Sequence, residues 1–295
     1  MDRRTLLLAA AASAAAPLVA AQPMRHVFTP PVMSGAPGEV TMTPWRAMPG
    51  VQVLVEGRGP FTFGIDTGFP GMLSVSDAVA QAAGLTPTGQ AQIGDPSGRN
   101  PVTVNRYTVA ALAIGGMTFA DVEAHASGLP APPSGPPLDG VIGMALFGPR
   151  TLVLDFKGRR VAVSGAGLPP ADGASSFDFT PGRLIELKVA IGDVVLPAHL
   201  DTGQSRLPLI VPQVALAGLK TTGEPRKVGE AHTVSQTIIM YAQGIDAPVR
   251  VGSVALPITE VGYPTIVPIA NLGAAALLQL VVSVDLRAGR VRLRA

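Results

Sequence analysis

The sequence contains the same unit twice, and this duplication constrains the fold more than any other feature of the chain. The tripeptide Asp66-Thr67-Gly68 follows an apolar stretch and precedes a Gly-Leu pair, and Asp201-Thr202-Gly203 does the same. From the aspartate to the glycine of that pair the separation is 84 − 66 = 18 residues in the first copy and 218 − 201 = 17 in the second. An internal repeat of this kind predicts two related structural units in one chain.

Three further landmarks follow each tripeptide in the same order. They are Leu112–Phe119 with Val249–Leu256, Val141-Ile142-Gly143 with Asn271-Leu272-Gly273, and Thr151–Val161 with Val281–Val291. The first and third pairs have the pattern of β-hairpins that turn at a glycine. We therefore expect lobe one at residues 40–164 and lobe two at 183–295, joined by a Pro- and Gly-rich linker at 165–182 and preceded by an extension at 22–39.

The composition favours an all-β body. Of the 295 residues, 47% are hydrophobic but only 4% are aromatic, which predicts a sizeable aliphatic core. The 34 glycines and 29 prolines show no period of three and indicate many turns between short strands. Alternating segments such as 51–56, 103–109 and 184–191 are typical of half-buried strands. One short helix per lobe is expected, after Ser76 and after Pro212.

The first 21 residues have the order of an export signal. Arg3 and Arg4 precede an apolar run of residues 6–16, and small residues follow at 19–21. The paired arginines are typical of a twin-arginine signal, although Asp2 stands where Ser or Thr is usual. The apolar run is too short for a stable membrane span. We therefore expect a periplasmic or secreted protein.

The residues before each aspartate explain why these two acids are the candidate catalytic groups. Phe61, Phe63 and Ile65 alternate on one face of a strand and leave Asp66 on the other face, and the second copy has the same pattern before Asp201. A carboxylate delivered by an apolar strand is costly unless it has a partner or a task. If the units pack about a pseudo-two-fold axis, each aspartate is the partner of the other, and the pair shares a proton.

At these residues the chain resembles the retropepsin-like and pepsin-like aspartic protease clan, most of all bacterial tandem retropepsin-type domains. The string of residues 138–143 and, less faithfully, residues 271–273 resemble the hydrophobic-hydrophobic-glycine motif of that clan. The resemblance implies a bilobed β-barrel fold with a substrate groove between the lobes. It also implies a flap at residues 90–107, and a second flap is expected near 225–234.

Together with the N-terminal signal, the resemblance implies the function of an exported aspartic endopeptidase. The catalytic residues would be Asp66 and Asp201, with loop support from Thr67, Gly68, Thr202 and Gly203. The expected partner is a peptide or protein substrate, with no nucleic acid, no stable membrane span, no cofactor and no metal. The protein would be a monomer with pseudo-dimeric lobes.

Two departures from the family pattern leave a second function open. The family usually has Ser, Ala or Thr after the glycine, whereas this chain has Phe69 and Gln204. The loss of a hydroxyl donor at both loops predicts a pH optimum less acidic than that of pepsin-like enzymes. The alternative is a catalytically inactive protein that binds or scaffolds peptides in the same groove. His199 lies two residues before Asp201 and either tunes that carboxylate or is an ordinary hydrogen-bonded histidine.

Other functional classes lack support in the sequence. The chain has no cysteine, and its four histidines show no metal-ligand spacing. Arginines cluster near the C-terminus at the spacing of a solvated strand face, and the formal charge is only +2. The substrate subsites cannot be assigned, because Met72, Leu73, Leu207 and Leu209 suit apolar subsites and the core equally well.

Overall fold

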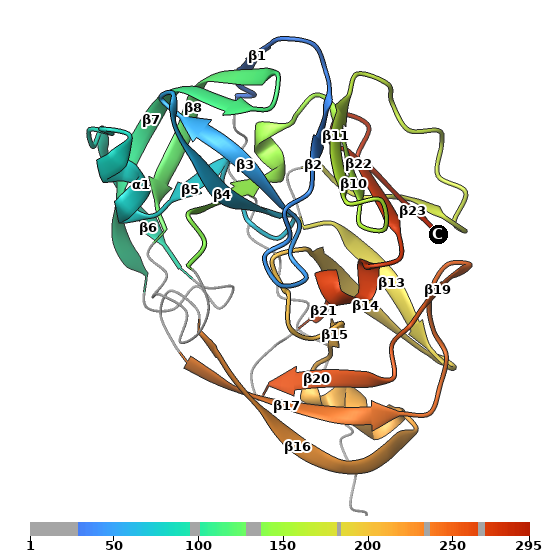
Figure 1. Ribbon diagram of the computed structural model, residues 1–295. Coiled ribbons are helices and arrows are strands. Elements are labelled where there is room, and N and C mark those ends of the chain that lie inside the picture. Colours follow the sequence, from blue (N-terminus) through green and yellow to red (C-terminus); the bar gives the residue numbers. More distant parts are fainter. Residues whose placement is uncertain (1–28, 95–100, 128–136, 182–183, 233–236, 265–268) are drawn as a thin grey trace, which may run out of the picture.

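The protein is built from two lobes joined by a central sheet, as the computed structural model shows (Figure 1). The structure describes residues 29–94, 101–127, 137–181, 184–232, 237–264 and 269–295. Nearly all of the regular structure in these residues is β-strand, which confirms the predicted all-β body. No helix in these ranges is long and apolar enough to cross a membrane.

Each lobe has its own large sheet. The first lobe contains β1 (Val32–Ser34), β3 (Gly50–Val55), β4 (Arg58–Asp66), β5 (Leu73–Val75), β6 (Gly89–Ile93), β7 (Val102–Ile114), β8 (Met117–Ala126) and β9 (Gly140–Gly143). The second lobe contains β13 (Glu186–Ile191), β14 (Val194–Asp201), β15 (Leu209–Ile210), β16 (Thr221–His232), β17 (Thr237–Ile245), β18 (Val249–Val251), β19 (Val254–Leu256), β20 (Glu260–Pro264) and β21 (Ala270–Gly273).

The strand order shows the repeat directly. The centre of the first sheet is β5-β9-β4-β3, and the centre of the second is β15-β21-β14-β13. In both lobes the strand that carries the aspartate pairs in parallel with the strand of the hydrophobic-hydrophobic-glycine motif: β4 with β9, and β14 with β21. The two Asp-Thr-Gly loops therefore occupy equivalent places in two equivalent sheets.

The central sheet joins the lobes through the two hairpins that end them. Its strands are β2 (Glu39–Thr41), β10 (Thr151–Asp155), β11 (Arg160–Ser164), β12 (Ser176–Asp178), β22 (Val281–Asp285) and β23 (Arg290–Arg294). In the order β12-β23-β22-β10-β11-β2, the hairpin β22-β23 of the second lobe lies beside the hairpin β10-β11 of the first. Strands β12 and β2 occupy the two edges, so the order is symmetric about its middle. The middle pair, β10 with β22, places Val153 opposite Ser283 and crosses from one lobe to the other.

Two segments that composition marked as connections contain strands that pair with the sheets. The predicted linker at 165–182 contains β12, which pairs with β23 as β2 pairs with β11. The predicted N-terminal extension contains β1, which pairs with β8 at the edge of the first lobe. Strands of only three residues give little local signal, and their pairing is set by the neighbouring hairpin rather than by propensity.

The predicted helices differ between the lobes. Helix α1 (Asp77–Ala82) begins where expected, and the Ser76 hydroxyl accepts a hydrogen bond of 3.2 Å from the Val79 amide as its N-cap. The segment after Pro212 forms the 3₁₀ helix η2 (Gln213–Gly218) instead, and Pro212 offers no side-chain cap. The other short helices are η1 (Met144–Leu146) and η3 (Ala274–Leu277), which follow β9 and β21.

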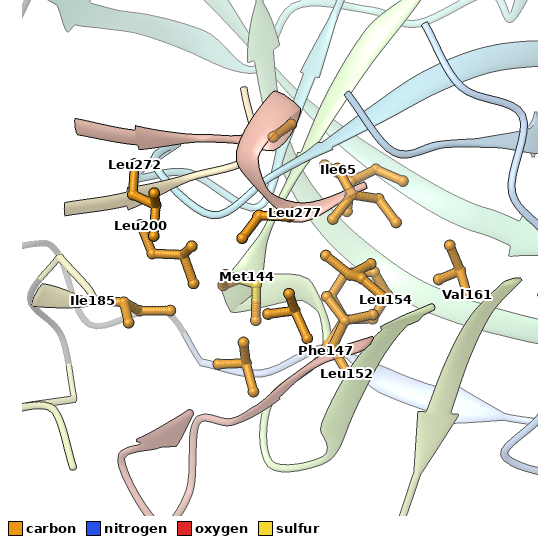
Figure 2. Close-up of a cluster of buried hydrophobic side chains, with 14 of the residues drawn as sticks. Ile65, Met144, Phe147, Leu152, Leu154, Val161, Ile185, Leu200, Leu272 and Leu277 are labelled. Carbon is orange, nitrogen blue, oxygen red and sulfur yellow. The ribbon is translucent and has the colours of Figure 1, made fainter. Parts of the chain in front are cut away.

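One aliphatic core runs through both lobes and the central sheet. Figure 2 shows this core where the lobes meet, with Ile65 of the first lobe, Leu200 and Leu272 of the second, and Leu152 and Leu154 of the central sheet. All five side chains are fully buried. Ile65 and Leu200 directly precede the two aspartates, so the shared core fixes the ends of both site-bearing strands.

Candidate active site

The two aspartates end their strands at the interface between the lobes. In register, Asp66 lies opposite Gly143 of β9, and Asp201 lies opposite Gly273 of β21. A Cβ on either glycine would collide with backbone oxygens of the neighbouring loop. The motif glycines therefore allow each aspartate loop to lie close to its neighbouring strand.

The two threonines connect the loops by reciprocal hydrogen bonds across the interface. The Thr67 hydroxyl donates to the Leu200 carbonyl at 2.7 Å and accepts from the Thr202 amide at 3.0 Å. The Thr202 hydroxyl donates to the Ile65 carbonyl at 2.6 Å and accepts from the Thr67 amide at 3.0 Å. Both threonines are essentially inaccessible to solvent, at 1% and 0% exposure. These four bonds fix the separation and orientation of the two aspartate loops.

Backbone amides orient one oxygen of each carboxyl group. Oδ1 of Asp66 accepts from the amides of Gly68 at 2.6 Å and Phe69 at 3.0 Å. Oδ1 of Asp201 accepts from the amides of Gly203 at 2.9 Å and Gln204 at 3.1 Å. The same turn therefore holds both carboxyl groups in equivalent orientations, as the duplication predicts.

The glycines of the tripeptides bring the carboxyl groups together. A Cβ on Gly68 would lie 2.8 Å from Oδ1 of Asp201 and 3.1 Å from Oδ1 of Asp66. A Cβ on Gly203 would collide with the carboxyl group of Asp66 in the same way. Each aspartate thus packs against the glycine of the opposite loop, and no larger residue fits at either position.

The pair of carboxyl groups does not ionise as two independent acids. Burial raises the pKa of Asp66 well above its ordinary value, and repulsion from the Asp201 charge raises it further. The amides of Gly68 and Phe69 act in the opposite direction but do not outweigh these effects, and a hydrogen bond joins the two carboxyl groups. A proton shared by two adjacent carboxyl groups leaves one oxygen able to accept a proton and the other group able to donate one.

The side chains of Phe69 and Gln204, the two residues that depart from the family pattern, make other contacts. The Phe69 ring lies against Gly71 and Gly143 and meets the His125 ring edge-on, with centroids 5.4 Å apart. Oε1 of Gln204 accepts from the Arg206 amide at 2.8 Å and so caps the turn that follows. Neither side chain replaces the hydroxyl donor usual after the glycine.

Lobe two nevertheless supplies a side-chain donor that sequence reasoning missed. Nδ2 of Asn271, on β21, donates to Oδ2 of Asp201 at 2.6 Å. The equivalent residue of lobe one is Val141, which has no donor to offer Asp66. The expected absence of a side-chain donor at both loops therefore holds for Asp66 alone. The signal was visible as a polar residue in a motif that otherwise reads hydrophobic-hydrophobic-glycine.

His199 lies on the same face as Asp201 and is the register partner of Asn271 on the adjacent parallel strand. Its side chain is buried, at 8% exposure. The first lobe has Gly64 opposite Val141 at these two places. The sheet face behind Asp201 is thus polar, whereas the face behind Asp66 is not.

A cavity of about 440 Å³ opens beside Phe69, between the stem of the predicted flap and the sheet of lobe one. It is lined by Pro70, Gly71, Met72, Leu73, Gln90, Ala91, Gln92, Ile93, Arg106, Glu123, Ala124 and His125. Met72 and Leu73 line this cavity but are also buried core residues of lobe one, and Leu207 and Leu209 are buried core residues of lobe two. Burial lowers the pKa of His125, partly offset by its hydrogen bond with the Ala126 carbonyl.

The predicted flaps correspond to two hairpins. Strands β6 and β7 form the stem of the first, and β16 and β17 form the second, which begins at Thr221 and so earlier than predicted. Residues 95–100 of the first predicted flap and residues 233–236 at the end of the second lie outside the described residues, as does the predicted signal at 1–21. Within the described ranges, no group of three or more His, Asp or Glu side chains could hold a metal ion.

Comparison with known proteins agrees with this geometry. Residues 51–146, within lobe one, match a family model described as aspartyl protease. No curated protein sequence matches the chain. Among solved structures, the aspartic proteinase from Irpex lacteus is similar at 11% identity, with 90% of this chain and 97% of that chain covered and a TM-score of 0.53. That likeness confirms the predicted bilobed acid-protease fold with two related lobes.

Proposed function

Because the chain belongs to the aspartic protease clan, we propose that it is an exported endopeptidase that hydrolyses peptide bonds with a water molecule activated between Asp66 and Asp201. The observation that carries this proposal is the set of reciprocal threonine bonds, which hold two equivalent carboxyl groups in contact. A buried carboxyl pair held by both halves of a chain has a cost in stability that a purely structural role does not require.

The reaction needs only the two carboxyl groups and water. The ionised carboxylate accepts a proton from water as the oxygen attacks the scissile carbonyl carbon, and the protonated carboxyl donates its proton to the carbonyl oxygen. The product is a neutral tetrahedral diol. The carboxyl that accepted the water proton then protonates the amide nitrogen, the C–N bond breaks, and one diol hydroxyl returns its proton to the other carboxyl. Both groups regain their starting states.

Substitution of either aspartate by asparagine tests the proposal. Asp66→Asn and Asp201→Asn keep the shape of the loops but remove the shared proton, so cleavage of an unfolded protein substrate should fall by at least about 10³-fold. Asp193→Asn, at an exposed turn between β13 and β14, is the matched control and should keep full activity. Full activity in either site variant would refute the proposed chemistry.

The same variants separate the protease from the peptide-binding alternative. A statine-type inhibitor places a hydroxyl between the two carboxyl groups and should bind the unaltered protein. If the unaltered protein binds peptides but does not cleave them, and both Asn variants bind equally well, the groove serves binding alone.

Export is the part of the proposal that rests on the N-terminal residues. Two arginines, an apolar run and a small-residue site stand in the order of a signal peptide. Cell fractionation of the full chain should recover the processed protein outside the cytoplasm, and replacement of Arg3 and Arg4 by Gln should retain it inside. Equal distribution of both forms would contradict export by this signal.

A further inference from the structure

The two carboxyl groups have equivalent loops but different surroundings, and one of the differing side chains donates a hydrogen bond to a carboxyl group. Both Oδ1 atoms accept two backbone amides. Oδ2 of Asp201 also accepts the Asn271 amide at 2.6 Å. Lobe one places Val141 at the same register position beside Asp66.

We propose that Asn271 is a positioning residue that holds the negative charge on Asp201 and thereby leaves the shared proton on Asp66. In the proposed hydrolysis, on which this inference rests, Asp201 is then the base that accepts the water proton. Asp66 is the acid that donates to the scissile carbonyl oxygen.

The orientation of the Asn271 amide supports the assignment. Its Nδ2 faces Oδ2 of Asp201, and because an NH₂ group can only donate, this contact favours the ionised form of that carboxyl group. Oδ1 of Asn271 is buried and has no hydrogen-bond partner among the described residues. A buried amide oxygen without a partner is costly, and the Asn271 side chain is retained in that state where lobe one has a valine. The donated bond to Asp201 is the compensating interaction.

The other groups near the pair agree with this assignment. The ionisable side chains on the strands that carry the pair are Arg58 and Asp66 on β4 and His199 and Asp201 on β14, with Arg58 at the end of β4 opposite to Asp66. Any positive charge on His199, which lies on the Asp201 side, would favour the ionised form of Asp201. The raised pKa of Asp66 agrees with a proton held there, and its cause is burial followed by the charge of Asp201.

The pH dependence of kcat/KM tests the assignment. Asn271→Val copies the lobe-one residue and removes the donor, so the acid limb of the profile should move up by about 1 pH unit. The mirror variant Val141→Asn offers a donor to Asp66 and should instead move the basic limb down. Thr151→Val, a buried threonine of the central sheet, should leave both limbs in place. An acid limb that stays fixed or moves down in Asn271→Val would overturn the proposal.

Carbon-13 NMR of labelled aspartate carboxyl groups gives a readout that does not need turnover. The resonances are assigned with the Asp66→Asn and Asp201→Asn variants. As the pH rises, the Asp201 signal should reach its ionised position first, and Asn271→Val should reduce the separation between the two titrations. If the protein cleaves nothing but this order is found, the proposed function fails and the role of Asn271 stands. If it cleaves and Asp66 ionises first, the role of Asn271 fails and the protease stands.

Discussion

Removal of one cross-lobe hydroxyl should be far more costly than removal of an ordinary buried hydroxyl. Thr67→Val keeps the shape of the side chain but leaves two backbone groups of the opposite lobe without partners, the Leu200 carbonyl and the Thr202 amide. Each unsatisfied buried group costs about 1–3 kcal/mol, so the free energy of unfolding should fall by about 2–6 kcal/mol. Thr202→Val should behave in the same way.

Thr151 is the matched control, because its buried hydroxyl donates a single bond of 2.7 Å to the Ala166 carbonyl. Thr151→Val should cost about 1–3 kcal/mol, since one acceptor loses its partner. Urea unfolding measures both losses. The cross-lobe variants should also lose about 10²-fold or more in kcat/KM, because small shifts of the reacting groups have effects of that size, whereas Thr151→Val should not. If Thr67→Val matches Thr151→Val in both stability and activity, the threonines do not position the carboxyl groups.

Two further predictions follow from the site and one from the central sheet. Gly68→Ala should reduce activity at least about 100-fold while the protein stays folded, because its Cβ would lie 2.8 Å from Oδ1 of Asp201. Gly165 has open space around it, so Gly165→Ala should leave activity unchanged in the same assay. Burial raises the pKa of Asp66 in the folded state, so the stability linked to this group is present below its unfolded pKa and is lost as pH rises through the folded pKa. Urea unfolding from about pH 4 to 8 should show this decline in the free energy of unfolding. An equal decline in the Asp66→Asn variant would contradict the prediction. The Arg160 side chain and then the Gly158 amide lower the pKa of Asp155, so its stabilising effect is present at neutral pH and is lost as pH falls through the folded pKa. Urea unfolding extended below about pH 4 should show that loss, and Arg160→Met should weaken it.

The duplication made the architecture predictable from the sequence. Short strands with alternating apolar residues indicate their own faces, and glycine turns set the ends of the hairpins, so β3, β10 and β22 lie where the pattern indicated. Strands β1 and β12 could not be predicted in this way. Their residues carry no alternation strong enough to identify a strand, and their pairing depends on a free edge that exists only once the neighbouring hairpin has formed.

The site was predictable to the level of its carboxyl groups but not of their surroundings. Asp66 and Asp201 follow from the repeat, and the threonine bonds follow from the symmetry about it. Asn271 lies 70 residues from Asp201 in sequence, and its contact depends on the parallel pairing of β14 with β21. The repeat alignment placed Asn271 opposite Val141, yet it could not say that the side chain faces the carboxyl group.

The arrangement has a consequence for why the two lobes belong to one chain. Groups that only position the carboxyl pair, the threonines, glycines and loop amides, are the same in both lobes, and two identical subunits could supply them equally well. A donor beside one carboxyl group only cannot come from identical subunits, because the symmetry that places it beside one aspartate places it beside the other. A fused pair is free of this restriction, since Asn271 and Val141 are independent positions. Hydrolysis by a shared proton requires one carboxyl group to act as acid and the other as base at each turnover. The fused chain can fix in its sequence which aspartate takes which role, whereas in a symmetric dimer only the bound substrate can distinguish the two.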